Sequence, residues 1–326
     1  FVAVEDGTFS FRGTSALSID NGSIEYSIDS GSTWNVLLRD ENSPVVQAGH
    51  KIMWKSTLLK PTNYVRPEDG NAVEGIGRFY STGKYEVEGN VMSLYYGDYF
   101  RGVTSLSGKP YAFACLFWST NYLGMGNVTN IERVCLPATT LSNFCYEHMF
   151  SDNPISGGLP YLPATSLTMY CYSAMFMGAI GIESIPSGYL PVTTLKQGCY
   201  HGMFLTCTSL TTAPELPATT LANGCYSAMF NGCTSLTTAP ELPATTLTNE
   251  CYINMFFNCT SLTTAPELPA TTLATRCYAY MFWGCRSLNY IKAMFTTAPS
   301  ANYTDSWVKS VAASGTFVKN SAAEWN

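Results

Sequence analysis

The sequence predicts a repeat solenoid preceded by a small all-β domain, and two observations carry this prediction. One unit of 26 residues recurs almost verbatim between residues 190 and 285, and its phrase CTSLTTAPELPATTL begins at Cys207, Cys233 and Cys259. Residues 1–92, in contrast, contain no repeat and consist of short apolar runs separated by turn residues. Near-exact repetition at this period is typical of proteins whose units stack in one dimension.

Composition excludes several classes of protein. Of the 326 residues only 12% are charged, about half the usual share, and the net charge is -6. A nucleic-acid-binding protein would show a basic face, so no nucleic-acid partner is expected. No run approaches the roughly 18 apolar residues of a membrane span. The chain opens at Phe1 without an initiator Met or a signal peptide. We therefore expect a mature or trimmed chain whose export signal was removed.

The first domain, residues 1–92, is predicted to be a small β-sandwich. Its apolar runs predict strands at residues 8–11, 23–28, 34–38, 51–54 and 84–92. Short strands spaced about ten residues apart favour a sandwich over a single open sheet.

One motif in this domain admits two interpretations. Residues 27–34 read SIDSGSTW and match the Asp-box S-x-D-x-G-x-T-W found in sialidases and other β-proteins. In a hairpin turn Asp29 can bind backbone amides, Gly31 can supply a positive φ, and Trp34 can anchor the returning strand. Propeller sialidases carry several boxes and an arginine cluster, and this chain has neither. A structural turn is therefore favoured over a glycosidase site.

The repeat array begins before its clean copies. Residues 99–106 align with residues 229–236, with Val103 in the place of Cys233, and predict a first coil near residue 96. A second, degenerate coil carries about seven extra residues near positions 124–131. Six Cys-Tyr-x-x-Met-Phe blocks follow, beginning at Cys145, Cys171, Cys199, Cys225, Cys251 and Cys277. The array is therefore assigned to residues 93–295, and its irregular early coils are expected to adapt it to the first domain.

Within one unit the residues predict a short helix and two extended arms. Cys225 with Met229, and Tyr226 with Phe230, are i,i+4 pairs that a helix over 223–232 would direct to one seam. Proline ends local strands, which leaves residues 235–239 and 244–247 as the arms. Stacking then places each apolar residue over its equivalent 26 positions away.

These residues carry a family resemblance. The order Phe230-x-x-Cys233-x-x-Leu236, closed by Pro240, resembles the F-x-x-C-x-x-L…P pattern of BspA-like leucine-rich-repeat surface proteins. The resemblance covers residues 96 to about 295. It implies a right-handed leucine-rich-repeat solenoid, with short strands and short helices in each coil, on or secreted from bacterial cells. Some members of that family are associated with adhesion.

The twelve cysteines form columns instead of a disulfide framework. Ten of them recur at equivalent places in successive units, and only Cys115 and Cys135 stand apart. Bridges eight residues apart would leave Cys145 and Cys171 opposite Asn153 and Ala179, so buried free thiols are expected. No C-x-x-C spacing indicates a metal site. Only three histidines are present, and His148 and His201 are expected to face solvent. No Cys–His nucleophile is therefore predicted, and neither is any cofactor.

Residues 296–326 are predicted to cap the array. A solenoid needs a cover for its last apolar coil. An amphipathic helix over residues 303–312, bearing Trp307, could supply that cover. A disordered tail is less favoured because it would expose Trp307 and Trp325.

A partner is expected on the faces where repeats differ. One such column holds Tyr161, Tyr189, Glu215, Glu241 and Glu267, predicted to form an exposed edge with a contact nearer the two tyrosines. A solvated edge without a partner, or a cation held by the three glutamates, is the alternative there. The predicted function is a non-enzymatic cell-surface or secreted binding or adhesion protein that uses the solenoid as a protein-interaction scaffold. The alternative is glycan binding, or less favourably glycoside hydrolysis, through the N-terminal domain.

Overall fold

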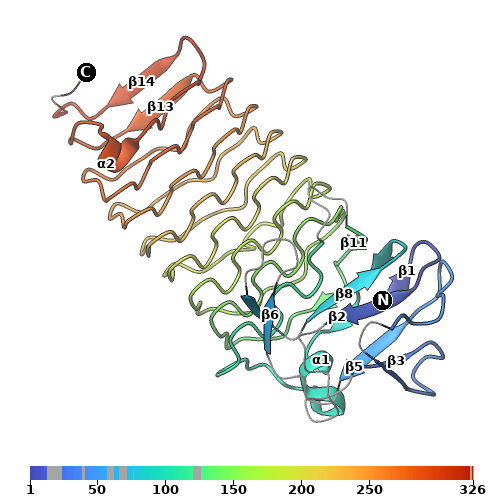
Figure 1. The fold of residues 1–326 in the computed structure, drawn as a ribbon. Helices are drawn as coiled ribbons and strands as arrows, with labels where there is room; N and C mark the ends of the chain where they lie inside the picture. Colours follow the sequence, from blue (N-terminus) through green and yellow to red (C-terminus); the bar gives the residue numbers. More distant parts are fainter. Residues whose placement is uncertain are drawn as a thin grey trace. The chain divides into compact units, whose positions relative to one another are not determined.

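The computed structural model describes residues 1–12, 24–38, 41–56, 62–65, 72–75, 77–119, 126–323 and 325. They form two compact units, Phe1–Ala164 and Thr165–Asn326 (Figure 1). The division falls inside the predicted array, so the domain boundaries after residues 92 and 295 stay predictions. Membership of the leucine-rich-repeat class likewise stays a prediction.

The first unit contains small sheets of two or three strands. Strand β3 (Ile24–Ser27) lies between β4 (Asn35–Leu37) and β5 (Met53–Ser56), and both pairings are antiparallel. The other antiparallel pairs are β1 (Val2–Ala3) with β9 (Tyr85–Glu86), β2 (Phe9–Arg12) with β8 (Arg78–Ser81), and β6 (Thr62–Val65) with β7 (Ala72–Gly75). Strands β2 to β5 overlap the predicted runs, although residue 23 lies outside the described residues. Strands β1, β6, β7 and β8 were not predicted.

The predicted strand at residues 84–92 is divided into β9 and β10 (Gly89–Asn90). Both pieces pair in parallel with a later segment: β9 with β11 (Val128–Asn130), and β10 with β12 (Val134–Cys135). The described part of the extra residues in the second coil thus supplies β11, the partner of β9, and β12 follows shortly after it. A register shift within β11 accompanies the break between β9 and β10.

The core of the first unit is aromatic. The ring of Phe79 lies 4.8 Å from that of Phe1, 5.0 Å from Trp54 and 5.7 Å from Phe117 between ring centroids. All four side chains are at most 9% exposed. Since burying a side chain of this size contributes about 1.5–3 kcal/mol, this cluster holds the short strands together where few backbone bonds can.

In the second unit, the Cys-Tyr-x-x-Met-Phe block is a ladder instead of the predicted helix. Alternate N–H groups donate to the next coil, as from Tyr226 to the Cys251 carbonyl and from Phe230 to the Met255 carbonyl. The N–H groups between them close local turns, as from Met229 to the Tyr226 carbonyl. Figure 1 shows the resulting coils one after another, from yellow-green to red.

The backbone angles explain why a helix does not form. Every fourth residue of the block has a positive φ, including Ala228 at 53° and Gly232 at 76°. An α-helix requires negative φ throughout and i→i−4 bonds. Here half of the donors bind the neighbouring coil, so the predicted helix over residues 223–232 is wrong although its inward residues are buried.

The extended arms pair only at single positions. Parallel bridges join Thr194 to Thr220, Thr212 to Thr238, and Thr264 to Tyr290. The prolines between the arms cannot donate ladder bonds, and this explains why bridges form here in place of longer strands.

At the C-terminal end the coil pattern continues beyond residue 295. Helix α2 covers only Ala301–Thr304, and the N–H groups of Tyr278 and Phe282 donate to the carbonyls of Tyr303 and Trp307. Strand β13 (Tyr290–Ala293) pairs in parallel with β14 (Thr316–Lys319). The predicted helix at residues 303–312 is therefore wrong, because residues 303–309 form a further coil. Trp307 is nevertheless buried, at 6% exposure.

Candidate functional site

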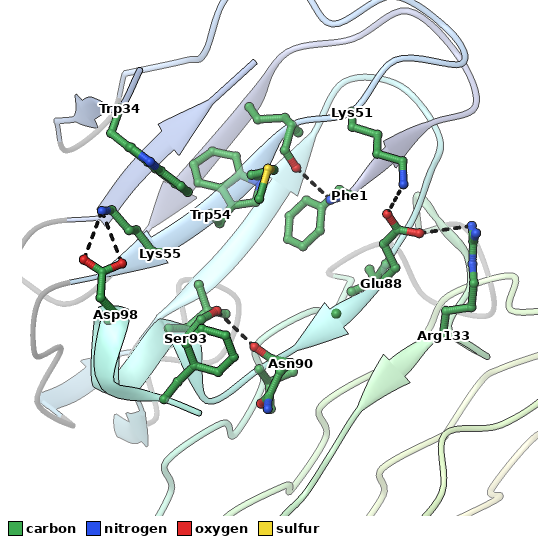
Figure 2. A pocket seen from close by; sticks show the side chains of 18 of the residues that line it. Phe1, Trp34, Lys51, Trp54, Lys55, Glu88, Asn90, Ser93, Asp98 and Arg133 are labelled. Atoms are coloured by element: carbon green, nitrogen blue, oxygen red, sulfur yellow. Dashed lines mark hydrogen bonds and ion pairs between the residues drawn. The ribbon is translucent and has the colours of Figure 1, made fainter. Parts of the chain in front are cut away.

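A pocket of about 470 Å³ lies in the first unit (Figure 2). One wall comes from strand β5 and the two residues before it. A second wall comes from the segment that follows β9 and continues through the short helices α1 (Ser93–Tyr96) and η2 (Gly97–Tyr99) to residue 100, and four isolated positions complete the lining. The lining residues are 51–55, 87–91, 93, 94, 97, 98 and 100, with Phe1, Trp34, Phe117 and Arg133. Its volume is that of a small-molecule or oligosaccharide site, for which roughly 300–1,000 Å³ is usual.

The interior of the pocket is apolar. Phe1, Trp54 and Phe117 belong to the aromatic core, and the rings of Phe1 and Trp54 lie 5.8 Å apart. The backbone nitrogen of Phe1 donates to the Ile52 carbonyl at 2.7 Å, which places this ring beside the strand. The other two aromatic residues of the lining, Trp34 and Phe100, are only half-buried, so part of each side chain is solvent-accessible.

One end of the pocket carries Trp34, Lys55 and Asp98 (Figure 2). The Lys55 ammonium lies 4.5 Å from the centroid of the Trp34 ring, a cation–π arrangement. The same nitrogen lies 3.4 Å from an Asp98 carboxylate oxygen and 3.6 Å from one of Glu25. Its positive charge is therefore shared between two carboxylates.

The opposite end carries Lys51, Glu88 and Arg133 (Figure 2). The Lys51 ammonium donates to Glu88 at 2.5 Å, and Arg133 lies 3.3 Å from the other Glu88 oxygen. The hydrogen bond from Lys51 lowers the pKa of Glu88 below its usual range. Arg133 also donates to Glu86 at 3.0 Å. All charges at this end are paired.

Between the two ends lie Asn90 and Ser93. The Ser93 hydroxyl donates to the Asn90 carbonyl at 3.0 Å, and the Asn90 side-chain oxygen accepts the Met92 N–H at 2.9 Å. The amide nitrogen of the Asn90 side chain has no hydrogen-bond partner among the described residues, and the residue is partly exposed. It is therefore a donor available to a ligand.

The Asp-box forms the turn between β3 and β4. Asp29 accepts from the Thr33 N–H at 2.9 Å and from the Thr33 hydroxyl at 2.6 Å, and Gly31 has a φ of 88°. The hydrogen bonds from Thr33 lower the pKa of Asp29 to about 2. The predicted turn roles of Asp29 and Gly31 are therefore confirmed. The carboxylate is occupied by its own turn, and Trp34 leaves that turn toward the pocket.

Of the predicted partner column, Tyr161 belongs to the first unit and the other four residues to the second. None of its five residues lines this pocket. Tyr161 is 78% exposed and Glu241 is exposed. Glu215 accepts from the Ser187 hydroxyl and the Gly188 N–H, so it holds the two-residue insertion of its neighbouring coil. Glu267 pairs with Lys292 at 2.9 Å.

Tyr189 contradicts the prediction of an exposed edge. Its side chain is only 8% exposed, and burial raises the pKa of its hydroxyl far above the usual value. The insertion at residues 187–188 shifts the chain locally, so the position equivalent to an exposed glutamate becomes interior. Tyr189 is consequently unsuited to be the surface contact proposed for it.

The ten cysteines of the predicted columns are all buried. All twelve are free, and only Cys135 is exposed. The thiol of Cys233 donates to the Phe204 carbonyl at 3.1 Å, and its counterpart Cys259 makes the same contact with Phe230. Burial raises the pKa of Cys171 and of Cys285 to about 12. Such thiols are protonated at neutral pH and are poor nucleophiles.

The part of the chain that the structure describes offers neither a metal-ligand cluster nor a membrane-spanning helix. No three His, Cys, Asp or Glu side chains within it lie close enough together to hold a metal ion. No helix in the same part of the chain is long and apolar enough to cross a membrane.

Sequence reasoning missed the pocket, because its lining comes from segments as far apart in the chain as Phe1 and Arg133. The one local signal was Trp34, which follows the Asp-box. Comparison with protein-family models, curated proteins and solved structures finds no match for this chain.

Proposed function

We propose that this chain is a non-enzymatic cell-surface or secreted binding protein, and that a glycan is its ligand. The observation that carries the proposal is the pocket of about 470 Å³ with half-buried Trp34 and Phe100 in its lining. Aromatic rings offer flat apolar faces, and paired charged groups beside them offer hydrogen bonds. Sugars present an apolar face and polar edges, which suits this combination. The surface location rests on the family resemblance and on the low content of charged residues.

The proposal includes that the pocket does not catalyse hydrolysis of the glycan. The Asp-box carboxylate is engaged by Thr33 within its turn. The two pocket carboxylates, Glu88 and Asp98, are held by cations. A glycosidase acid requires a raised pKa, whereas ion pairing lowers that of Glu88.

The test is a glycan-array screen of the full chain, followed by titration of the glycans that bind. Phe100→Ala should weaken binding about tenfold, which corresponds to the loss of about 1.4 kcal/mol of ring contact. Tyr99→Ala is the matched control, because Tyr99 is adjacent, 88% exposed and outside the pocket lining. Equal binding by the two variants would place the site elsewhere. Hydrolysis of reporter glycosides would refute the non-enzymatic part.

A protein partner on the repeat array is the second candidate, favoured by an aromatic cluster in the second unit. Phe257 and Trp283 hold equivalent positions in consecutive coils, are half-buried, and have ring centroids 5.7 Å apart. The Lys309 ammonium lies 4.3 Å from the Trp283 ring. If the chain binds a protein and no glycan, Trp283→Ala should weaken that binding more than Glu241→Ala.

A further inference from the structure

The charged groups around the pocket are already neutralised by one another. Lys51 and Arg133 face Glu88, and Arg133 also faces Glu86. At the other end Lys55 faces both Asp98 and Glu25. No cation of these two clusters is left without a carboxylate. An anionic ligand would have to displace an existing partner before it could form its own ion pair.

The balance of side-chain charge points the same way. The two clusters contain three cations, Lys51, Lys55 and Arg133, and four carboxylates, Glu25, Glu86, Glu88 and Asp98, so their sum is 3 − 4 = −1. Glu25 and Glu86 lie outside the pocket lining, whose own charged side chains sum to 3 − 2 = +1. Neither sum leaves an unpaired charge that would select a sialic acid, sulfate, uronic acid or cationic group, because an excess of one charge among paired groups acts only within about 10 Å at moderate salt.

The polar group that is available is neutral. The side-chain nitrogen of Asn90 is free among the described residues and lies between the two charged ends (Figure 2). An amide N–H is a suitable donor to a hydroxyl or acetamido oxygen. Half-buried Trp34 and Phe100 supply ring surface for an apolar sugar face.

We propose that the pocket selects an uncharged oligosaccharide, which packs against Trp34 and Phe100 and accepts a hydrogen bond from Asn90. This inference rests on the proposed function and adds the charge class of the ligand and its polar contact. The ion pairs at the two ends position the walls and do not recognise a charged group.

The experiment uses the full chain and an array of neutral oligosaccharides with their sialylated, sulfated, uronic-acid and free-amine counterparts. Neutral members should bind, and adding a charge to the same core should weaken binding at least about tenfold. The affinity for a neutral member should change less than about twofold between about 0.05 and about 0.5 M NaCl, since ionic contacts are screened over that range.

Two variants test the polar contact. Asn90→Asp keeps the oxygen that accepts the Met92 N–H but removes the amide donor, so neutral-glycan binding should fall about tenfold. Asn249→Asp makes the same change at an exposed residue of the second unit, outside the pocket lining, and should leave that binding within about twofold. Unchanged thermal midpoints for both variants would show that folding is not the cause.

The outcomes separate the two proposals. Preferred binding of charged glycans, abolished by Phe100→Ala, would overturn the selection for uncharged ligands and leave the pocket as the glycan site. Full affinity of Asn90→Asp would overturn the proposed hydrogen bond. Binding of no glycan, or binding insensitive to Phe100→Ala, would refute the proposed function itself.

Discussion

The buried tyrosine and phenylalanine rings of the Cys-Tyr-x-x-Met-Phe blocks in the second unit pack against equivalent rings of neighbouring coils. Phe230 is fully buried, and its ring lies 6.1 Å from that of Phe204 and 5.8 Å from that of Phe256, nearly parallel to both. Tyr226 repeats this arrangement with Tyr200 and Tyr252 at 5.9 Å. Because a repeat stacks identical shapes, one substitution removes contacts on two sides.

Phe230→Ala should lower the free energy of unfolding by about 3–5 kcal/mol, the usual loss for a buried phenylalanine. Equilibrium urea denaturation of the second unit's transition measures the effect. Thr238→Ala, in an exposed arm of the same coil, is the control and should change stability by less than about 0.5 kcal/mol. A loss below about 1 kcal/mol for Phe230→Ala would mean that the interior rings do not support one another.

At the scale of an element, the hairpin of β3 and β4 depends on its turn. Ser27 contributes as well as Asp29, because its hydroxyl donates to Asp29 at 2.7 Å and accepts the Gly31 N–H at 2.8 Å. The turn therefore satisfies its polar groups with hydrogen bonds inside the turn and independently of the strand pairing. This explains why an eight-residue motif was sufficient to predict it.

The Asp29 carboxylate should make this hairpin sensitive to acid. Its folded pKa of about 2 lies below the ordinary value of 3.8, so the unfolded chain binds the proton more tightly. The stabilisation is complete above about pH 4, decreases as the pH falls toward 2, and is lost below that. Thermal midpoints of the first unit between pH 2 and 7 should show this slope.

Asp29→Asn should lower the midpoint at neutral pH and remove that part of the slope. Ser32→Ala is the control from the same turn, because it removes only the hydroxyl that donates to the Asp29 carbonyl. It should keep the slope. Identical pH profiles of the wild type and Asp29→Asn would contradict the role given to the carboxylate.

At the scale of the whole molecule, the reactivity of the cysteines measures how well the interior of each unit is closed to solvent. Cys115, Cys135 and Cys145 belong to the first unit and the other nine to the second. Eleven are buried, and a buried thiol reacts only when its surroundings open.

Thiol titration of the native protein should therefore label Cys135 rapidly and the remaining eleven only after denaturation. Cys135→Ser should abolish the rapid phase. The never-reduced, denatured protein should show twelve thiols, and a lower count would indicate a disulfide-stapled scaffold.

Several features were predictable because they depend on neighbours in sequence or on the repeat period. The Asp-box turn is local, and the buried columns of Cys225, Met229 and Phe230 follow from residues recurring 26 positions apart. The wrong helix shows the limit of this reasoning. The i,i+4 spacing identified which side chains face inward, but several backbone conformations satisfy that spacing. Hydrogen bonds between coils selected one with a positive φ at every fourth residue.

The sequence by itself determined the repeat, the inward-facing residues, the absence of disulfides between the column cysteines and the turn at Asp29. Tertiary structure alone decided the backbone of each coil, the burial of Tyr189 and the pocket. The physical reason is the separation along the chain between the residues that come into contact. A repeat places each residue against its own copy, so the repeat period predicts its contacts. In contrast, Trp34, Phe100 and Arg133 line one pocket only after the sheets and short helices of the first unit have packed.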